Sequence, residues 1–429
     1  MPNAKNDRDT MSQFKQRFTG QSGIVSLMED LGNALNQSPD IIMMGGGNPA
    51  VIDEVQTVLA KHWHAVANDP SLFKKLTGEY QPPQGSPRFL QALAAYFKNT
   101  CAWDVSEKNI AVSNGAQSAF FTLFNSLAGL TRNNKSPKKI LLPLTPDYLG
   151  YVDVGLDEAM FIGHKPRITL QGDQQFKYAI DFDPLVIDDS IAAVCLSRPT
   201  NPSGNIVTDI EIERLANLCA ENNTPLIIDL AYGKPFPNVT FVDHHLTWQD
   251  NCIFVMSLSK LGLPGARTGL VIANEEMIQR FSRATATLCL APGNMGPSLG
   301  ESLLANGDMQ YLSNDIIQPY YQEKMQQALD YCLNTAGDIP LRVHQAEGAF
   351  FLWLWFEGLP VTSQALYERL KERGVLVLSG HHFFQAVDDE QWPHQHECLR
   401  VSYCQPWDKV QQGFDIIFDE VKTIYRERI

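Results

Sequence analysis

The chain has 429 residues, of which 44% are hydrophobic and 19% are charged. This composition is that of an ordinary globular protein, and the length predicts roughly two to three domains. The net charge of −14 opposes nucleic acid or an anionic membrane as the main partner, because both require a basic face. The longest strongly apolar stretch, residues 349–356, is too short to span a bilayer.

Residues 1–10 are polar and lack the apolar core of a signal peptide. We expect them to form a disordered extension, with Met11 as an alternative start. The eight cysteines include no Cys-x-x-Cys pair, and several lie in apolar runs. They are therefore expected to be reduced thiols in a cytoplasmic protein.

The middle of the chain alternates predicted strands with predicted helices. Strands are expected at residues 109–113, 139–142, 192–197, 225–229, 252–257 and 268–273, and a helix is expected at residues 115–129. Thr208-Asp-Ile-Glu211 has the spacing of a capping box, and apolar residues then recur with helical period from Ile212 to Cys219. Continuous apolar strands separated by helices predict a mostly parallel sheet that is covered on both faces.

After about residue 319 the pattern changes to that of a smaller α+β domain. Helices are predicted at residues 320–335, 362–373 and 410–421, and strands at residues 375–378 and 399–402; an apolar segment lies at residues 348–355. We expect the segment before about residue 60 to pack with this domain. The predicted division is an N-terminal arm and part of the small domain at residues 1–57, a large domain at 58–319 and the small C-terminal domain at 320–429.

Lys260 ends an apolar, strand-like run and follows Ser257 and Ser259 closely. A lysine at the mouth of a buried strand is costly unless its amine has a function. A Pro-Gly turn and Arg267 come next along the chain. Burial and a neighbouring positive charge lower the pKa of an amine, so these residues predict a lysine that forms a Schiff base beside a phosphate site.

Other predicted strands also end in polar residues, where open α/β sheets bind ligands. Residues 113–118 join a strand to a helix, and form either a phosphate-binding helix N-terminus or a plain turn. Asp229 either holds a heteroaromatic nitrogen protonated or serves as a helix cap or ion-pair partner. Residues 197–204 form either a stiff turn or a loop that points the Asn201 amide at a cofactor oxygen.

Together these motifs resemble the class I and II aminotransferases, which are fold-type I pyridoxal-phosphate enzymes. The resemblance covers nearly the whole chain and rests on the order of its motifs, which are Gly47-Asn-Pro49, Tyr80 to Gly85, Asn114-Gly-Ala116, Pro146-Asp-Tyr148, Asn201-Pro-Ser-Gly204, Asp229-x-x-Tyr232, Ser257-Leu-Ser-Lys260, Arg267 and Arg400-Val-Ser402. Phrases such as Ser-Arg-Pro-Thr-Asn-Pro and Phe-Leu-Trp-Leu-Trp-Phe are similar to the valine–pyruvate group. The resemblance implies an α/β large domain with a mostly parallel seven-stranded sheet, plus a smaller α+β domain.

The resemblance also implies pyridoxal 5'-phosphate as cofactor, and ping-pong transamination between valine or alanine and pyruvate or 3-methyl-2-oxobutanoate. It makes Lys260 the residue that bonds to the cofactor and then moves a proton as general acid and base, with Asp229 and Tyr232 as further catalytic residues. The implied cofactor-binding residues are Gly115, Ala116, Gln117, Tyr148, Asn201, Asp229, Tyr232, Ser257, Lys260, Arg267 and, from the partner subunit of a homodimer, Tyr80. The implied substrate-binding residues are Gly47, Asn201 and Arg400. The guanidinium of Arg400 would bind the substrate α-carboxylate through two parallel hydrogen bonds.

Several alternatives stay open on these residues. Relatives commonly place the phosphate arginine eight positions after the lysine, whereas Arg267 follows by seven. Packing alone could explain Tyr148 or Tyr151, and an interdomain ion pair could explain Arg400.

Two other functions and a metal site were weighed against transamination. The same lysine and aspartate would serve a carbon–sulfur lyase, or an aminotransferase of other specificity. A pyridoxal-phosphate-sensing transcription regulator would need a DNA-binding module, for which too few residues precede Gly45. The pairs His381-His382 and His394-Gln-His396 suggest a metal, but they lack a partner pair with zinc-ligand spacing, so no metal is expected.

Overall fold

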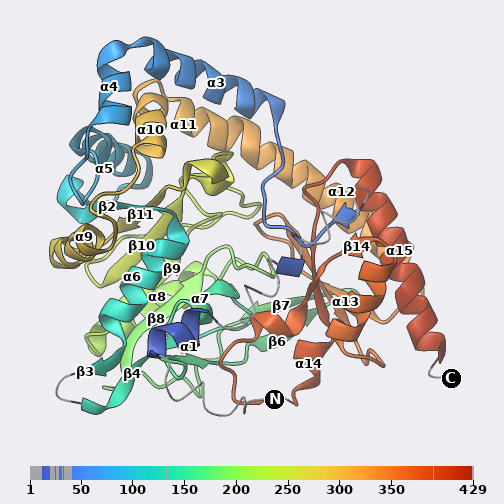
Figure 1. Cartoon of the computed structure of the whole chain (residues 1–429). Coiled ribbons are helices and arrows are strands. Elements are labelled where there is room, and N and C mark those ends of the chain that lie inside the picture. Colours follow the sequence, from blue (N-terminus) through green and yellow to red (C-terminus); the bar gives the residue numbers. More distant parts are fainter. Residues whose placement is uncertain are drawn as a thin grey trace, which may run out of the picture.

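The computed structural model describes residues 12–19, 25, 29–30, 32, 41–131, 134–389 and 391–427. The expected extension at residues 1–10 and the alternative start at Met11 lie outside these residues. Within the described part, an eight-stranded sheet and a six-stranded sheet form the two halves of the molecule (Figure 1). None of the described helices is long and apolar enough to cross a membrane.

The large sheet contains β2 (Ile110–Ser113), β3 (Gly129–Thr131), β4 (Asn134–Leu142), β5 (Phe161–Gly163), β8 (Ile191–Ser197), β9 (Leu226–Asp229), β10 (Cys252–Ser257) and β11 (Gly269–Ile272). Its order is β2-β11-β10-β9-β8-β4-β3, with β5 also paired to β4. Strands β5, β4, β8, β9 and β10 are parallel, and β11 runs antiparallel to β10 and β2. The predicted mostly parallel sheet is confirmed, and the hairpin partner β3 makes it one strand larger than the predicted seven.

Helices cover this sheet on both faces, as the continuous apolar strands predicted. Helices α5 (Pro87–Cys101) and α8 (Asp209–Glu221) share one core with alternate strand residues such as Ile228 and Phe254. Helices α6 (Ala116–Leu127) and α9 (Glu275–Cys289) share a second core with the intervening residues, such as Ile227 and Val255. Successive strand residues point to opposite faces, so each face has its own apolar set.

The predicted capping box begins helix α8. The Thr208 hydroxyl accepts the Glu211 N–H at 3.3 Å, and the Glu211 carboxylate accepts the Thr208 N–H at 3.0 Å. Two backbone donors of the first helical turn are satisfied in this way.

The second sheet has the order β15-β16-β13-β12-β7-β6. Its strands are β6 (Arg167–Gln171), β7 (Gln175–Ala179), β12 (Leu341–His344), β13 (Phe351–Phe356), β15 (Leu378–Ser379) and β16 (Cys398–Ser402). The hairpin β6–β7 comes from the middle of the chain, and β7 pairs with β12 in parallel. The short strand β1 (Ile42–Met43) pairs with β14 (Val375–Leu376), which joins the N-terminal segment to the C-terminal part.

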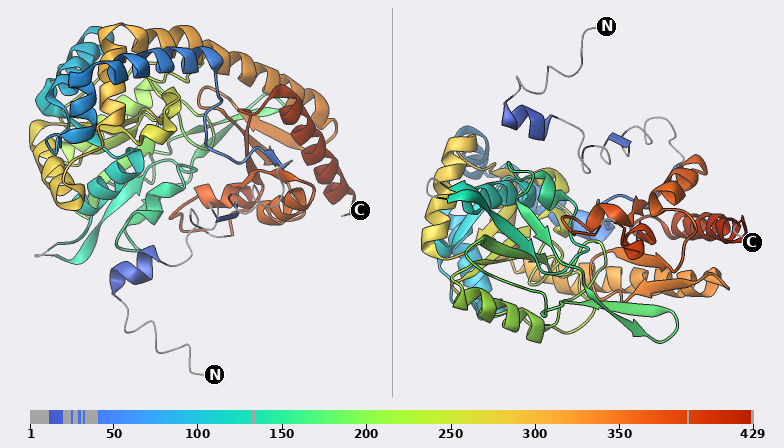
Figure 2. Two further views of the ribbon diagram at one scale, coloured as in Figure 1. Left: turned by 45° about the horizontal axis from the view of Figure 1, so that its top comes forward. Right: turned by 90° about the horizontal axis from the view of Figure 1, so that it is seen from below.

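The remaining helices connect and cover the two sheets. They are α1 (Gln13–Phe18), α3 (Asp53–Asn68), α4 (Pro70–Gly78), α7 (Gly150–Asp153), α10 (Met295–Ala305), α11 (Asp308–Tyr311), α12 (Gln318–Ala336), α13 (Ser363–Glu372), α14 (Pro393–His396) and α15 (Trp407–Glu427). Both views of Figure 2 show α12 reaching from the large sheet toward the C-terminal part. The domain boundaries at residues 57 and 319 stay a prediction, because the β6–β7 hairpin pairs across the second of them.

Candidate active site

The carboxyl ends of four strands meet at one edge of the large sheet. Strands β2, β8, β9 and β10 end at Ser113, Ser197, Asp229 and Ser257. Each of these residues lies two positions after a strand residue of the core that the sheet shares with α6 and α9. Since side chains two positions apart in a strand point the same way, all four point to the face of the sheet that α6 and α9 cover. Ser197 and Asp229 are direct neighbours in the parallel β8–β9 pair. The sheet therefore gathers polar groups beside the N-terminus of α6.

A cavity of about 250 Å³ lies at this edge. Its lining consists of Gly45, Gly47, Ala116, Gln117, Phe120, Tyr148, Leu149, Ser197, Pro199, Asn201, Asp229, Ala231, Tyr232, Ser257, Ser259, Lys260, Arg267 and Arg400. Every residue expected in the site lines this cavity except Gly115 and Tyr80. Gly115 adjoins the lining at Ala116, whereas Tyr80 lies between α4 and α5 with 85% of its surface exposed.

Lys260 lies in a single 3-10 turn, Ser259–Leu261, directly after β10. Its Nζ donates a hydrogen bond to the carbonyl oxygen of Gly47 at 2.5 Å. The Tyr232 ring centre is 5.5 Å from the same nitrogen. Burial lowers the pKa of Lys260 to about 8, and the positive charge of Arg400 acts in the same direction. A lysine with this pKa is partly neutral near physiological pH and can act as a nucleophile.

Asp229 has one hydrogen-bond donor on each carboxylate oxygen. Oδ1 accepts the Ala231 N–H at 2.9 Å, and Oδ2 accepts the Tyr151 hydroxyl at 2.9 Å. Burial raises the pKa of Asp229 to about 6, whereas these two hydrogen bonds and the charge of Lys260 lower it. The carboxylate is thus held in a fixed plane with oxygen lone pairs left for a ligand in the cavity.

A second buried carboxylate, Asp147, fixes the loop that carries Tyr148. It accepts the N–H groups of Tyr148 at 2.7 Å and Ser197 at 3.0 Å, and also the Ser197 hydroxyl. Burial raises the pKa of Asp147 to about 7, and the charge of Asp229 adds to the increase. Sequence reasoning quoted the motif Pro146-Asp-Tyr148 without giving Asp147 a role. A carboxylate inside an apolar loop was the available signal.

The part of the cavity near Gly115 and Arg267 is suited to binding an anion. Gly115 has a φ of 98°, and a Cβ placed there would lie 2.4 Å from Arg267 Nη2. Glycine is therefore required both for the backbone angle and for the close approach of the guanidinium. The N-terminus of α6 and the hydroxyls of Ser257 and Ser259 lie at the same end, with the two hydroxyls 2.9 Å apart. A helix N-terminus beside an arginine favours a phosphate.

Arg400 comes from the other sheet, where β16 pairs with β13 and β15. Its Nη1 donates to Asn201 Oδ1 and its Nη2 donates to the Gly45 carbonyl oxygen, both at 2.7 Å. Its Nε is buried and has no partner among the described residues. The Phe351 ring lies 4.0 Å from the guanidinium carbon, and burial lowers the pKa of Arg400 to about 10. No carboxylate pairs with this guanidinium in the described structure, which leaves it suited to a ligand carboxylate.

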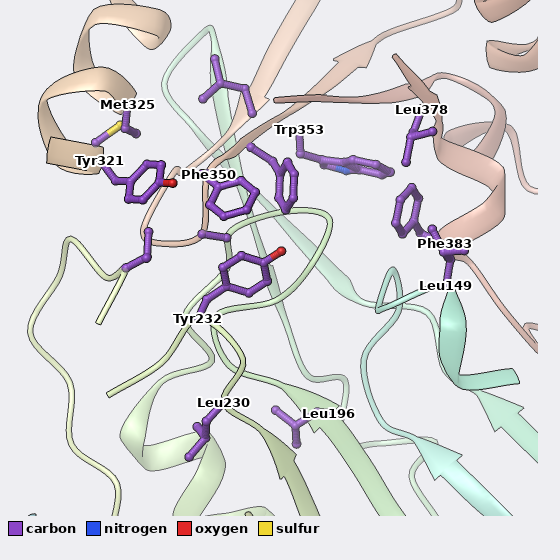
Figure 3. Close-up of a cluster of buried hydrophobic side chains, with 14 of the residues drawn as sticks. Leu149, Leu196, Leu230, Tyr232, Tyr321, Met325, Phe350, Trp353, Leu378 and Phe383 are labelled. Carbon is purple, nitrogen blue, oxygen red and sulfur yellow. The ribbon is translucent and has the colours of Figure 1, made fainter. Parts of the chain in front are cut away.

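Tyr232, which lines the cavity, belongs to a cluster of buried aromatic and aliphatic side chains that also includes Phe350 and Trp353 (Figure 3). The Tyr232 ring packs edge-on against Phe350 with 5.1 Å between ring centres. Leu149 lies near Phe383, and its carbonyl oxygen accepts a hydrogen bond from the Gln385 side chain. Gln117 donates to the Gly150 carbonyl oxygen at 3.1 Å, which ties α6 to the start of α7.

The histidine pairs form no metal site within the described residues. The rings of His381 and His382 are 3.9 Å apart, and Ser379 bonds to His381. His394 is buried on α14, and its Nε2 contacts the hydroxyl of Tyr178 on β7 of the second sheet. His396 stacks beside His381, with 6.1 Å between ring centres.

Like Asp147, Tyr151 and Leu149 bear directly on this site without a predicted role in it. Tyr151 was left as a packing residue, yet it bonds to Asp229. Leu149 was not considered, although it contributes to the apolar part of the cavity lining. The closeness of Tyr151 to Tyr148, three positions apart in the chain, was the available signal that both could face one region.

The cavity fits pyridoxal phosphate on its own chemistry. It offers an amine of lowered pKa, a carboxylate for the ring nitrogen, an aromatic ring at Tyr148 and an anion site whose glycine leaves room for Arg267. Arg400 also lines the cavity, and its guanidinium offers N–H donors for an amino-acid carboxylate. Fold and site together define a pyridoxal-phosphate enzyme that acts on amino acids.

Comparison with known proteins gives the family. The sequence model of aminotransferase class I and II matches residues 39–415. The valine–pyruvate aminotransferase of Escherichia coli (strain K12) is 42% identical over 421 residues, covering 97% of this chain and 99% of the relative. The chain belongs to the class I and II aminotransferases and uses pyridoxal phosphate.

Solved structures agree with this assignment. The valine–pyruvate aminotransferase of Salmonella typhimurium LT2 has a TM-score of 0.86 at 41% identity, covering 94% of this chain and 100% of that one. Aspartate aminotransferase from Thermus thermophilus with maleate has a TM-score of 0.76 at 18% identity, covering 96% and 99% of the two chains. At that identity the second likeness concerns the fold alone.

We predict that covalent capture of pyridoxal phosphate by the cofactor-free protein follows a titration near pH 8. Burial lowers the pKa of Lys260 from 10.5 to about 8, so the neutral amine forms above pH 8 rather than above 10.5. The capture rate should rise about tenfold per pH unit below this value and level off above it. Borohydride trapping and peptide mass spectrometry measure the rate at residue 260.

Other lysines of the same protein serve as the internal control, because their labelling should keep rising to higher pH. The Lys260→Ala variant should give no adduct at this position. A midpoint near pH 10.5 for residue 260 would contradict the lowered pKa.

Proposed function

We propose that this aminotransferase exchanges the amino group between a small aliphatic amino acid, valine or alanine, and a 2-oxo acid, pyruvate or 3-methyl-2-oxobutanoate. The observation that carries the proposal is the buried Arg400, which has no carboxylate partner among the described residues and lines a cavity together with Leu149, Pro199 and Ala231. The identity with valine–pyruvate aminotransferases over nearly the full chain supports the same substrates. Apolar contacts discriminate neighbouring side chains by only about 1–3 kcal/mol per methylene, so some breadth of donors is expected.

In this proposal each cavity residue has a defined task in binding or proton transfer. When bound, pyridoxal phosphate supplies the carbonyl carbon that accepts the amine and a ring that withdraws electrons. Lys260 would hold the cofactor through its amine and, once the substrate amine has taken that place, would move the proton at the substrate α-carbon, helped by its lowered pKa. Asp229 keeps the ring nitrogen protonated through its carboxylate.

The remaining residues hold and orient the bound molecules. Tyr148 stacks on the ring, and Asn201 and Tyr232 bond to the cofactor's 3-oxygen. The phosphate-binding set is Gly115, Ala116, Gln117, Ser257 and Arg267. The guanidinium of Arg400 forks the substrate α-carboxylate beside Asn201 and the Gly47 backbone, and the Asn201 contact at 2.7 Å aligns the fork.

A panel of amino donors tests the substrate assignment. With pyruvate or 3-methyl-2-oxobutanoate as acceptor, valine and alanine should give the highest kcat/KM. Aspartate and lysine should fall at least about 100-fold lower, because a charge must be desolvated in an apolar site. Formation of the 2-oxo acid is measured, and Lys260→Ala is the inactive control with rates several orders of magnitude lower.

The same assays distinguish an aminotransferase from a carbon–sulfur lyase. Release of pyruvate from cystathionine without any acceptor, at a rate above transamination, would overturn the proposed function. Preference for another donor, such as aspartate, would overturn only the substrate assignment.

The Arg400→Lys variant should bind amino acids more weakly with a smaller change in kcat. One ammonium group cannot reproduce a planar fork, and the Asn201 and Gly45 contacts would lose their common donor. We expect KM to rise about 10- to 100-fold for every amino donor. Steady-state kinetics over the same panel measure this, and an unchanged KM for all donors would exclude Arg400 from carboxylate binding.

We further propose a homodimer in which Tyr80 reaches the phosphate site of the partner subunit. Tyr80 and Leu290 are 85% and 64% exposed, although both are large and partly or wholly apolar. Asn294 donates to the carbonyl oxygens of Lys75 and Glu79, which brings the segment near Leu290 toward the one that precedes Tyr80. An exposed apolar surface of this kind supports an interface.

Sedimentation analysis tests the dimer. The mass obtained from sedimentation should be twice the 48.0 kDa chain mass, and Leu290→Asp should lower it toward that of the monomer. Ile210→Asp is the matched control, because Ile210 is 78% exposed on α8. Tyr80→Phe should keep the dimer but lower cofactor affinity about tenfold, since one charge-assisted hydrogen bond is lost. A monomer of full activity would refute the arrangement.

A cytoplasmic location is part of the same proposal. All eight cysteines are free thiols, and most are buried. A reducing compartment would keep them in this state.

A further inference from the structure

Tyr151 is a buried tyrosine whose ring cannot easily change direction. It lies on the short helix α7 and is 0% exposed. Phe120, Phe124 and Tyr148 pack against it edge-on, with ring centres 4.9, 5.8 and 5.3 Å away. Aromatic contacts on several sides fix both the ring and the hydroxyl it carries.

The hydroxyl of Tyr151 donates its hydrogen bond to Asp229. The hydroxyl lies 2.9 Å from Asp229 Oδ2. Asp147 is the other carboxylate nearby, but its oxygens already accept two N–H groups and the Ser197 hydroxyl. Burial and the charge of Asp229 raise the pKa of Tyr151 well above its ordinary value, so the residue stays a neutral donor.

The bond to Tyr151 opposes the cost of burying Asp229. A buried carboxylate tends to take up a proton, and a hydrogen bond to the charged form counteracts this tendency. Only two donors reach Asp229 among the described residues, Tyr151 on Oδ2 and the Ala231 N–H on Oδ1. Losing Tyr151 would leave Oδ2 buried without a donor.

We propose that Tyr151 is a positioning residue for the cofactor, whose hydroxyl holds the Asp229 carboxylate ionised and turned toward the pyridine nitrogen. The inference rests on the proposed pairing of Asp229 with that nitrogen. Tyr151 itself touches neither cofactor nor substrate and acts through Asp229. Its effect must therefore depend on the charge at residue 229.

A double-mutant cycle tests this dependence. Dissociation constants for pyridoxal phosphate are measured by equilibrium dialysis for the full-length protein, Tyr151→Phe, Asp229→Asn and the double variant. Tyr151→Phe should weaken binding about 10- to 100-fold in the natural background, because a hydrogen bond to a charged group is lost. In the Asp229→Asn background the same change should cost less than about threefold, since the charge is absent.

The absorbance spectrum of the bound cofactor provides a second readout. The spectrum of Tyr151→Phe should shift in the same direction as that of Asp229→Asn. Tyr178→Phe is the matched control, because this tyrosine of the second sheet is also 0% exposed and hydrogen-bonded, but to His394 on α14. It should lower the unfolding temperature without changing cofactor affinity or spectrum.

The outcomes separate this inference from the proposed pairing. An equal loss of affinity in both backgrounds would make Tyr151 a packing residue and overturn the inference. An unchanged affinity in Tyr151→Phe together with a weakened Asp229→Asn would also overturn it, while leaving the pairing intact. An Asp229→Asn protein with natural affinity and spectrum would instead refute the pairing itself.

Discussion

The burial of charge at the carboxyl edge of the large sheet is the constraint on which the site depends. Desolvation drives Lys260 and Asp229 toward their neutral forms, lowering one pKa to about 8 and raising the other to about 6. In water, with ordinary pKa values of 10.5 and 3.8, the lysine would be almost fully protonated and the aspartate almost fully ionised at neutral pH. Burial therefore has two effects. It makes the amine nucleophilic, and it leaves the carboxylate able to pair with a cationic ring.

The two sheets divide the work of recognition. The large sheet presents Ser257, Asp229 and the N-terminus of α6 on one face, because strand residues of equal parity point the same way. The smaller sheet contributes Arg400 from β16, which donates a hydrogen bond to the side chain of Asn201 in the loop after β8. The proposed cofactor contacts thus come mainly from the large sheet and its loops, and the proposed contact to the substrate carboxylate comes from the smaller sheet. Any movement of one part relative to the other would change the substrate site more than the cofactor site.

Much of this arrangement follows from local sequence, and the remainder depends on distant contacts. The strands at β8, β9 and β10 were predicted because they are continuous apolar runs, and their polar last residues marked the site. The β6–β7 hairpin was not predicted, because it mixes polar and apolar residues and pairs with β12 more than 160 positions later, as in Val343 with Gln175. The role of Tyr151 was missed for a similar reason. Its neighbour Asp229 lies 78 positions away in sequence, and only the turn of α7 decides which of two nearby tyrosines faces the carboxylate.

The overall charge of the chain and the charge of its cavity have opposite signs, which explains how an acidic protein can bind anions. The chain carries −14, yet Lys260, Arg267 and Arg400 all line one cavity. Asp229 and Asp147 are both buried with raised pKa values, so their negative charge offsets these cations only in part. A cofactor phosphate and a substrate carboxylate would supply the missing anions at opposite ends, one at Arg267 and the other at Arg400. Arg400 is 3% exposed, and a cation buried in this way attracts such a ligand more strongly than a surface lysine could, because the surrounding dielectric is low. The surface acidity then serves solubility, while the selectivity for anionic ligands is set locally by the strand ends.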